Sequence, residues 1–149
     1  MIRRIGKPPL KGQSYKLRPG TYAILPLETR FLLTAETGSD VDIQLPGGGI
    51  DSDESPLQAL YREVREEIGW TIAKPKRLGA FRRFVFMPEY DLWAEKVCHV
   101  YVAHPVRQIA PATEPHHVTL VLSAEDALAA LGNDGDRMFL HRYVKSGFP

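Results

Sequence analysis

The chain has 149 residues, of which 44% are hydrophobic and 25% are charged, and these proportions are ordinary for one globular domain with its own core. Its 19 Lys and Arg nearly balance its 18 Asp and Glu, so the net charge of +1 gives no sign of a nucleic-acid or membrane binder. No apolar run reaches the roughly 20 residues that a membrane helix needs, and the single cysteine, Cys98, favours a cytoplasmic location.

The first segment, residues 1–18, is rich in Lys and Arg and contains no acid. It lacks the apolar stretch of a signal peptide. We expect a solvated arm or a strand added to a sheet edge, with attraction of phosphate as an alternative. We treat residues 1–149 as a single domain that carries this basic segment at its start.

The rest of the chain mixes β-rich runs with helical ones. Strands are predicted for residues 21–28, 30–36, 41–46, 77–87, 95–104 and 117–123, and helices for residues 124–131 and 135–147. The first two strands form a hairpin, in which Pro26 favours an edge or a bulge. Ser123 caps the first of these two helices and Gly132 ends it. Because there is no regular βαβ alternation, we expect an α/β (α+β) fold with a mixed central sheet and helices on its faces.

A third helix is predicted between residues 56 and 68. Ser55 is a good N-cap, and Pro56 occupies the first helical position, where its missing N–H costs nothing. Gln58 stands three residues after Ser55 and completes a capping box. Gly69 ends the helix.

This third helix is unusually acidic. Helical spacing predicts a core-facing side made of Leu57, Leu60, Tyr61, Val64 and Ile68. Glu63, Glu66 and Glu67 lie together on another side, where they repel one another unless a cation neutralises them. Oxygen ligands in such a cluster suit Mg²⁺ or Mn²⁺. The alternative is a solvated acidic face, with Arg62 and Arg65 as intrahelical partners.

The residues before and along the helix have a defined spacing. Gly47, Gly48 and Gly49 let the backbone approach the acidic side closely. From Gly48 the sequence runs five residues to Glu54 and seven more to the stretch 62–70, REVREEIGW. This pattern resembles the signature of the Nudix hydrolase family, G-x5-E-x7-R-E-U-x-E-E-x-G-U with U bulky and apolar, at every defined position. The resemblance implies an α/β/α sandwich.

The resemblance also implies an activity, that of a Nudix-type pyrophosphohydrolase. Such enzymes hydrolyse a nucleoside diphosphate linked to another moiety, X, by attack of water on phosphorus, and give a nucleotide and phosphorylated X. Diphosphate hydrolysis needs positioning and charge neutralisation, which divalent ions supply. The alternative is a non-catalytic nucleotide-binding or regulatory module with the same fold. Such modules typically lose glutamates of the motif, and this chain retains them.

Residue roles follow from the resemblance position by position. The expected ligands of Mg²⁺ or Mn²⁺ are the carbonyl of Gly47 and the side chains of Glu63, Glu66 and Glu67. Arg62 would orient the glutamates, and Glu54 would pair with Arg62. Glu66 or Glu63 is the candidate general base, so the expected catalytic group is Glu54, Arg62, Glu63 and Glu66.

Outside the motif, a further acidic ligand is expected from a later loop. Glu114 is our candidate, and an exposed loop acid is the alternative reading. Weaker candidates for a role in the site are His116, His117, Glu89 and Glu95.

Substrate contacts are predicted at Gly48 and in the stretch FRRF, residues 81–84, where alternation places Arg82 and Arg83 on opposite faces of a strand. One arginine would reach a substrate phosphate; core aromatics with exposed arginines are the alternative. Tyr90, Trp93 and Tyr101 are pocket or packing candidates.

The expected partner is a small-molecule nucleoside diphosphate derivative, and neither nucleic acid nor membrane is expected. Within the family, a proline or a tyrosine after the motif marks ADP-ribose or dinucleoside polyphosphate enzymes, but Pro88 and Tyr90 both lie farther on than is usual. ADP-ribose, a nucleotide sugar, a dinucleoside polyphosphate and a modified nucleoside triphosphate therefore stay open. Family members are often dimers, so a homodimer is one alternative for the assembly.

Overall fold

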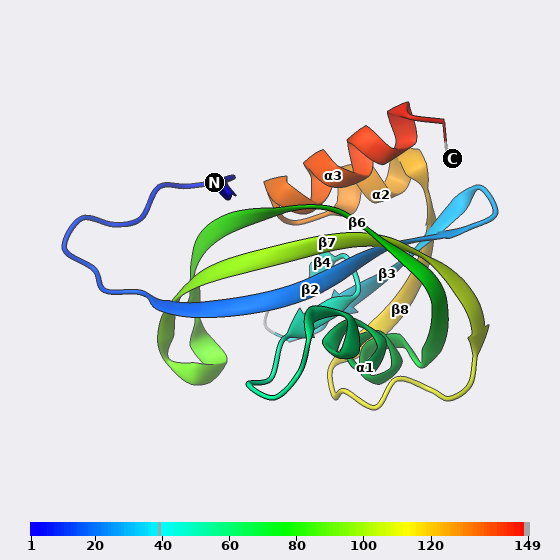
Figure 1. Cartoon of the computed structure of the whole chain (residues 1–149), viewed down its shortest axis with the longest axis horizontal. Coiled ribbons are helices and arrows are strands. Elements are labelled where there is room, and N and C mark those ends of the chain that lie inside the picture. Colours follow the sequence, from blue (N-terminus) through cyan, green and yellow to red (C-terminus); the bar gives the residue numbers. More distant parts are fainter. Residues whose placement is uncertain (39, 148–149) are drawn as a thin grey trace.

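The structure is a computed structural model of the chain, and it describes residues 1–38 and 40–147. Three helices enclose the strands from two sides: α1 (Pro56–Ile68) covers one face, and α2 (Ala124–Ala130) and α3 (Asp134–Lys145) lie side by side on the other (Figure 1). The predicted α/β/α sandwich with helices on both faces is therefore confirmed.

The strands form one mixed arrangement. They are β1 (Arg3–Arg4), β2 (Lys16–Leu27), β3 (Arg30–Glu36), β4 (Asp42–Gln44), β5 (Gly47–Gly49), β6 (Trp70–Met87), β7 (Leu92–Gln108) and β8 (His117–Ser123). Their order is β1-β6-β7-β2-β3-β4, with β5 paired to β2 and β8 paired to β3. The β1–β6 and β2–β7 pairs are parallel and the others are antiparallel. A short helix, η1 (Pro88–Tyr90), joins β6 to β7.

Strand β2 connects the two halves of this arrangement. Its residues from Lys16 to Ile24 pair with β7, and its last residues, Leu25 to Leu27, pair with β3. Pro26 lies past the last pairing with β7, so its missing N–H removes no bond on that side.

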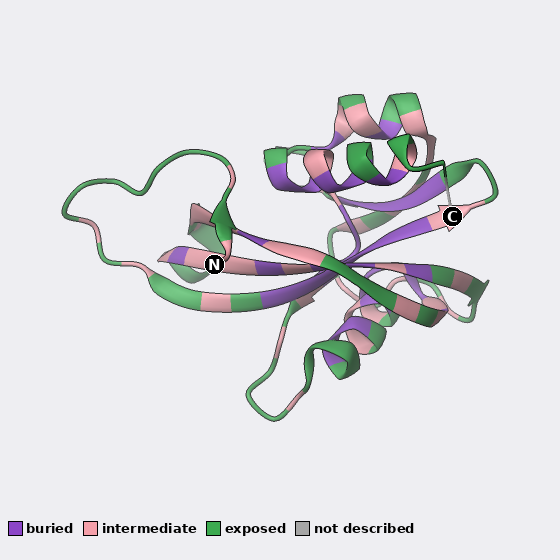
Figure 2. Ribbon diagram, turned by 45° about the horizontal axis from the view of Figure 1, so that its top comes forward, coloured by how far each residue is buried: buried purple, intermediate pink, exposed green. Residues whose placement is uncertain are grey.

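Two hydrophobic clusters lie on opposite sides of β2, because side chains alternate along a strand. Tyr22 and Ile24 belong to the cluster that includes residues of α2 and α3, and Ala23 and Leu25 belong to the cluster that includes Leu60, Val64 and Ile68 of α1. Figure 2 shows buried residues along the middle strands and on the inward sides of the helices. These clusters fix α1 against the strands.

Helix α1 begins and ends as the sequence predicts. The Ser55 hydroxyl accepts a hydrogen bond from the Gln58 N–H, and the Gln58 side chain accepts one from the Ser55 N–H, so the capping box is complete. Gly69 closes the helix in the left-handed conformation with φ 73°. One expectation is wrong: Leu57 and Tyr61 are about two-fifths exposed, since the contact side of α1 is narrower than a five-residue stripe.

Most other elements agree with the prediction. Strands β6 and β7 are longer than expected and form a long antiparallel hairpin. The basic first segment contains both expected alternatives: Arg3 and Arg4 pair with β6 at the sheet edge, and an irregular stretch follows up to Lys16. None of the described helices combines the length and the apolar character that a membrane span requires.

Candidate functional site

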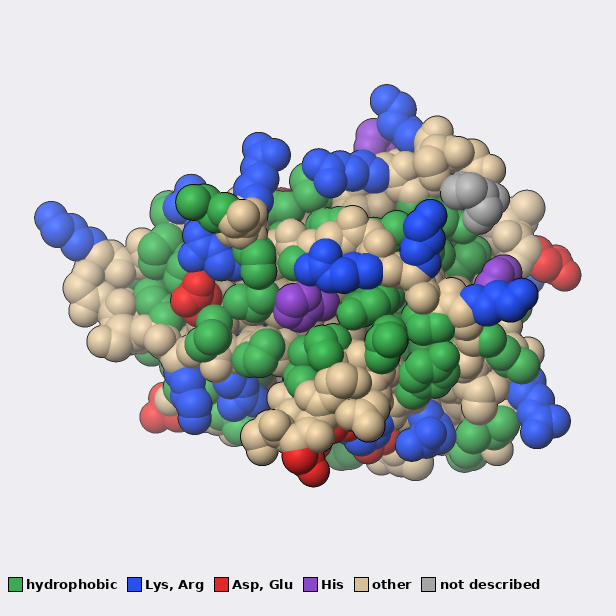
Figure 3. Space-filling view, in the orientation of Figure 1, with side chains coloured by type: hydrophobic (Ala, Val, Ile, Leu, Met, Phe, Trp, Pro, Cys, Tyr) green, Lys and Arg blue, Asp and Glu red, His purple; other side chains and the backbone are tan. Residues whose placement is uncertain are grey.

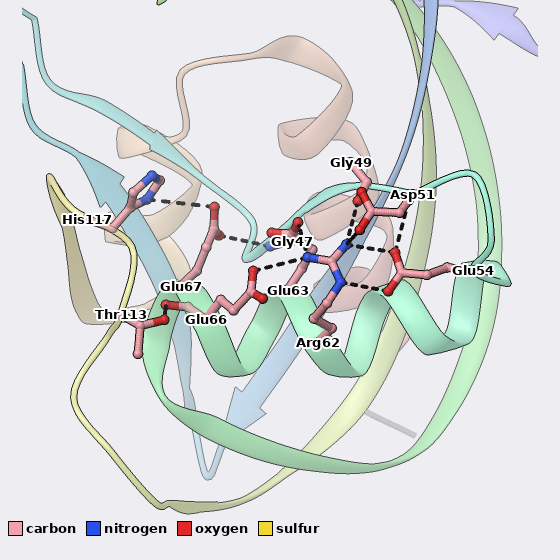
Figure 4. Close-up of polar contacts among 10 residues, drawn as sticks. All are labelled: Gly47, Gly49, Asp51, Glu54, Arg62, Glu63, Glu66, Glu67, Thr113 and His117. Atoms are coloured by element: carbon pink, nitrogen blue, oxygen red, sulfur yellow. Dashed lines mark hydrogen bonds and ion pairs between the residues drawn. The ribbon is translucent and has the colours of Figure 1, made fainter.

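Arg62 is the centre of a partly buried hydrogen-bond network on α1 (Figure 4). Its guanidinium donates to both carboxylate oxygens of Glu54, at 2.6 and 2.8 Å, and to the carbonyl of Gly49 at 3.0 Å. The same group donates from Nη1 to Glu63 at 2.9 Å and to Glu66 at 3.0 Å. Arg62 therefore holds two of the helix carboxylates at fixed positions, as its expected orienting role requires.

Glu63, Glu66 and Glu114 form a carboxylate cluster, in which one oxygen from each side chain lies within 4.8 Å of the other two. Burial raises the pKa of the Glu63 carboxyl, and the hydrogen bond from Arg62 opposes that rise. Three carboxylates at this separation repel one another, whereas a hard divalent cation such as Mg²⁺ accepts oxygen ligands in this number and spacing. The donor set therefore fits a divalent ion.

Glu114 joins the cluster because its loop is bound to the end of α1. The backbone N–H groups of Thr113 and Glu114 donate to the carbonyl of Glu66 at 2.8 and 3.1 Å, and the Thr113 hydroxyl donates to the same carbonyl at 3.2 Å. Two further N–H groups, those of Ile109 and Ala110, donate to the carbonyl of Gly69. The free carbonyls at the helix end are thus used to hold the loop.

Glu67 points away from this cluster, toward β5 (Gly47–Gly49), which we call the glycine strand. One of its oxygens accepts a hydrogen bond from the Gly47 N–H at 3.0 Å, and the other lies 3.7 Å from Nδ1 of His117. Thr34 makes a 3.1 Å hydrogen bond with the same His117 nitrogen. Burial raises the pKa of the Glu67 carboxyl well above its usual value, and the Gly47 N–H opposes that rise. Glu67 is therefore a buried carboxylate next to the cluster.

Gly48 is held against Glu63. A Cβ atom at position 48 would lie 2.3 Å from a carboxylate oxygen of Glu63, so a side chain there would displace that carboxylate. At position 49, by contrast, a Cβ would meet nothing within 4 Å. The predicted close approach of the backbone to the acidic side is present, and it is tightest at Gly48.

The cluster opens into a cavity of about 300 Å³, which we call the catalytic cleft. Its walls come from the glycine strand, α1, the loop of Glu114, the start of β2 and the turn at η1. Its lining includes Arg18, Tyr22, Glu36, Gln44, Gly47, Gly48, Glu63, Glu67, Met87, Glu89, Tyr90, Lys96, Glu114 and His117. A neighbouring cavity of about 410 Å³, the side cleft, shares part of this lining and adds Arg83, Val85 and Phe86.

The structure separates the two arginines of the FRRF stretch. Arg83 lines the side cleft. Arg82 lies on the other face of β6, where it donates to Glu95 at 2.9 Å and to the carbonyl of Ile2 at 3.0 Å and so holds β1. Arg82 therefore does not lie with the carboxylate cluster, contrary to its expected role as a substrate contact.

Other candidates divide in the same way. Glu89, Tyr90 and His117 line the catalytic cleft. Trp93 packs against Tyr15 and Phe86 outside the catalytic cleft, and Tyr101 is buried in the core.

Two cleft residues, Arg18 and Lys96, are not singled out by the sequence analysis. For Lys96 the sequence offered one signal: it lies two positions before Cys98, so on a strand a charged side chain shares a face with a cysteine that is expected to be buried. On the face shown in Figure 3, Lys and Arg side chains are scattered among hydrophobic ones and do not gather in one patch.

These observations define the class of protein: an α+β sandwich in which an acidic helix and a glycine turn build a carboxylate site suited to a divalent ion. Residues 16–143 match the family model of the NUDIX domain. The chain belongs to the NUDIX family, so the expectation from the motif is confirmed.

Comparison with known proteins supports this assignment. An RNA pyrophosphohydrolase of Cellvibrio japonicus is 31% identical over 134 residues, covering 89% of this chain and 74% of that protein. An RNA pyrophosphohydrolase of Halorhodospira halophila is 40% identical over 68 residues, but this match covers only 46% of this chain and 38% of that relative. A NUDIX hydrolase from Nitrosomonas europaea has the same fold, with TM-score 0.71 and 18% identity over 89% of this chain and 90% of that one.

Proposed function

We propose that the protein is a Nudix-type pyrophosphohydrolase that cleaves the diphosphate linkage of a nucleoside diphosphate derivative with the help of Mg²⁺ or Mn²⁺. The observation that carries this proposal is the convergence of Glu63, Glu66 and Glu114 on one point at the wall of the catalytic cleft. The names of relatives agree with it: RNA pyrophosphohydrolase among the sequences and ADP compounds hydrolase among the fold neighbours.

The ion would be held by Glu63, Glu66 and Glu114, with Glu67 and the carbonyl of Gly47 beside them. When bound, it would neutralise phosphate charge and lower the pKa of a coordinated water. Gly48, which has no side chain, leaves the carboxylate of Glu63 free to face the cleft.

The residues of this chain supply orientation and a base. Arg62 fixes the Glu63 and Glu66 carboxylates by hydrogen bonds, so they need no reorganisation during the reaction. We propose Glu66 or Glu63 as the general base, because each binds Arg62 through one carboxylate oxygen and has a second oxygen with which to accept a proton from water.

The test is a panel of nucleoside diphosphate derivatives incubated with the protein and Mg²⁺, with products followed by ³¹P NMR. We expect a nucleotide and a phosphorylated second product, no turnover with EDTA, and loss of most turnover in Glu66→Gln. Glu125→Gln, in the exposed first turn of α2, is the control for loss of one acid. Turnover by Glu66→Gln at the parent rate would refute the assignment of Glu66, and absence of turnover across the panel would favour the non-catalytic module.

We also propose a cytoplasmic location for the protein. Cys98 is the only cysteine and is buried, so the fold uses no disulfide and suits the reducing cytoplasm.

A further inference from the structure

Three basic residues lie in register on adjacent strands and line the two clefts. Arg18 of β2 pairs with Lys96 of β7, and Lys96 pairs with Arg83 of β6. Side chains in register on neighbouring strands lie on the same face of the sheet. Arg18 and Lys96 line the catalytic cleft, while Lys96 and Arg83 line the side cleft. We call these three residues the cation row, and it joins the two clefts.

The positive charge of the cation row is not neutralised by ion pairs. Within the described residues, neither Arg18, Lys96 nor Arg83 forms a salt bridge, although Arg62 and Arg82 do. Like charges directly opposite one another on neighbouring strands destabilise a sheet. All three side chains are partly buried, so water screens their repulsion less than it would on an open surface. Such a cost is expected where an anion is to be bound.

The neighbours of the cation row leave that charge available. The Arg18 guanidinium lies 5.1 Å from the centre of the Tyr90 ring, and the Lys96 ammonium lies 5.9 Å from the centre of the Tyr22 ring. Aromatic rings attract a cation without neutralising its charge.

Acids are present near the cation row, but they are not bound to it. Glu36 and Glu89 border both clefts, and Asp40 and Asp42 line the side cleft. Within the described part of the chain, none of these four acids forms a salt bridge with the cation row. The buried Asp136 carboxylate accepts a hydrogen bond from the Leu45 N–H, and Arg83 and Lys96 act on it only through space, where their charge opposes the rise of its pKa by burial.

We propose that the cation row binds the phosphate chain of the substrate beyond the cleaved linkage, and that the protein therefore prefers substrates with three or more linked phosphates over diphosphates joined to a neutral sugar. This inference rests on the proposed function, since the carboxylate cluster would hold the reacting end. The row extends across two interstrand spacings, about 10 Å. A diphosphate at the cluster would meet Arg18 and Lys96, whereas a longer phosphate chain would also reach Arg83.

Binding without chemistry provides the first test. Inorganic tripolyphosphate and pyrophosphate are titrated calorimetrically into the protein in EDTA, at two salt concentrations. Tripolyphosphate should bind several-fold more tightly than pyrophosphate, and its affinity should fall with salt. Arg83→Gln should weaken tripolyphosphate binding several-fold, and Lys96→Gln should weaken the binding of both anions. Equal affinities of the parent protein for the two anions would overturn the proposal.

Controls separate charge from fold. Arg77→Gln removes a positive charge from the same strand, outside both clefts, and should leave tripolyphosphate affinity unchanged. Arg83→Lys keeps the charge and should restore most of the affinity that Arg83→Gln loses. If Arg83→Gln and Arg77→Gln behaved alike, the row would have no role in binding.

Kinetics provide the second test and keep the two proposals apart. The ratio of kcat/KM for a nucleoside triphosphate over a nucleotide sugar should exceed one in the parent and fall several-fold in Arg83→Gln. Glu66→Gln should lose turnover with both substrates and keep its tripolyphosphate affinity. Binding without turnover would therefore refute only the hydrolase, and turnover without a preference for the longer phosphate chain would refute only the cation row.

Discussion

Glu54 holds Arg62 by two parallel hydrogen bonds, one from Nε to Oε2 at 2.6 Å and one from Nη2 to Oε1 at 2.8 Å. This leaves Nη1 to contact Glu63 and Glu66. The hydrogen bond from Arg62 lowers the pKa of the Glu54 carboxyl to about 2, so Glu54 stays ionised at neutral pH. The orientation of the cluster thus depends on a residue eight positions before Arg62 that lies outside α1.

Arg62→Lys tests this dependence. A lysine ammonium lacks the planar fork that binds Glu54 through two bonds while reaching Glu63 and Glu66. We expect kcat/KM to fall about 10- to 100-fold, the range found when residues that orient metal ligands are changed. Glu54→Gln should lower kcat/KM by a similar factor, and its effect on KM should be smaller than its effect on kcat. Parent-level kcat/KM in both variants would show that Arg62 does not orient the cluster.

Gly48→Ala tests the packing of the glycine strand on the cluster. The new Cβ would lie 2.3 Å from a Glu63 oxygen, so the carboxylate must move. We expect the affinity for Mn²⁺, measured by calorimetry, to fall by about 10-fold or more. Gly49→Ala is the matched variant, because its Cβ meets nothing within 4 Å, and its loss should be much smaller. Equal losses would assign the effect to strand flexibility.

Asp136 tests how the strand before the glycine turn is anchored. Its buried carboxylate accepts a 3.0 Å hydrogen bond from the Leu45 N–H. Asp136→Ala would leave that N–H without a partner and should lower the free energy of unfolding by about 1–3 kcal/mol. Asp136→Asn keeps an acceptor for the Leu45 N–H and should lose less stability than Asp136→Ala. Urea unfolding followed by circular dichroism measures both.

The pH dependence of Asp136→Asn has a definite sign. Burial raises the pKa of the Asp136 carboxyl above the usual 3.8. The folded protein therefore holds this proton more tightly than the unfolded chain. As pH rises from 3.8 through the raised pKa, the parent loses stability that Asp136→Asn does not lose. The free energy of unfolding of the variant minus that of the parent should increase over this interval; a decrease would contradict a raised pKa.

Ser55→Ala tests the start of α1. The hydroxyl of Ser55 caps the Gln58 N–H, and removing an N-cap of this kind costs about 1 kcal/mol. We expect a lower midpoint of urea unfolding with an unchanged slope, and Ser55→Gly should lose only a few tenths of a kcal/mol. Equal stability of Ser55→Ala and the parent would mean that the cap contributes nothing.

The sequence was sufficient for α1 because its signals are local. A capping box, Pro56, Gly69 and the motif spacing all act within one stretch of chain. The exposure of Leu57 and Tyr61 could not be predicted in the same way, since it depends on how closely the strands approach the helix. Periodicity gives the direction of a side chain and not the depth of its neighbours.

Long-range register accounts for what the sequence analysis missed. Arg18, Lys96 and Arg83 are distant in sequence and meet only through the β2–β7 and β7–β6 pairings. Glu114 could be proposed as a ligand but not located, because its position comes from hydrogen bonds between its loop and the Glu66 carbonyl. Arg82 and Arg83 were equivalent until the structure showed which face of β6 meets the clefts.

The attachment of the 109–114 loop to α1 has a mechanical consequence. Because backbone N–H groups of the loop are hydrogen-bonded to the carbonyls of Glu66 and Gly69, any movement of α1 would displace Glu114 together with Glu63 and Glu66. The helix and the loop would then move as one rigid unit, and the distances among the three acids would stay the same. Lengthening this connection by a residue or two would uncouple the two pieces, even though every acid would still be present.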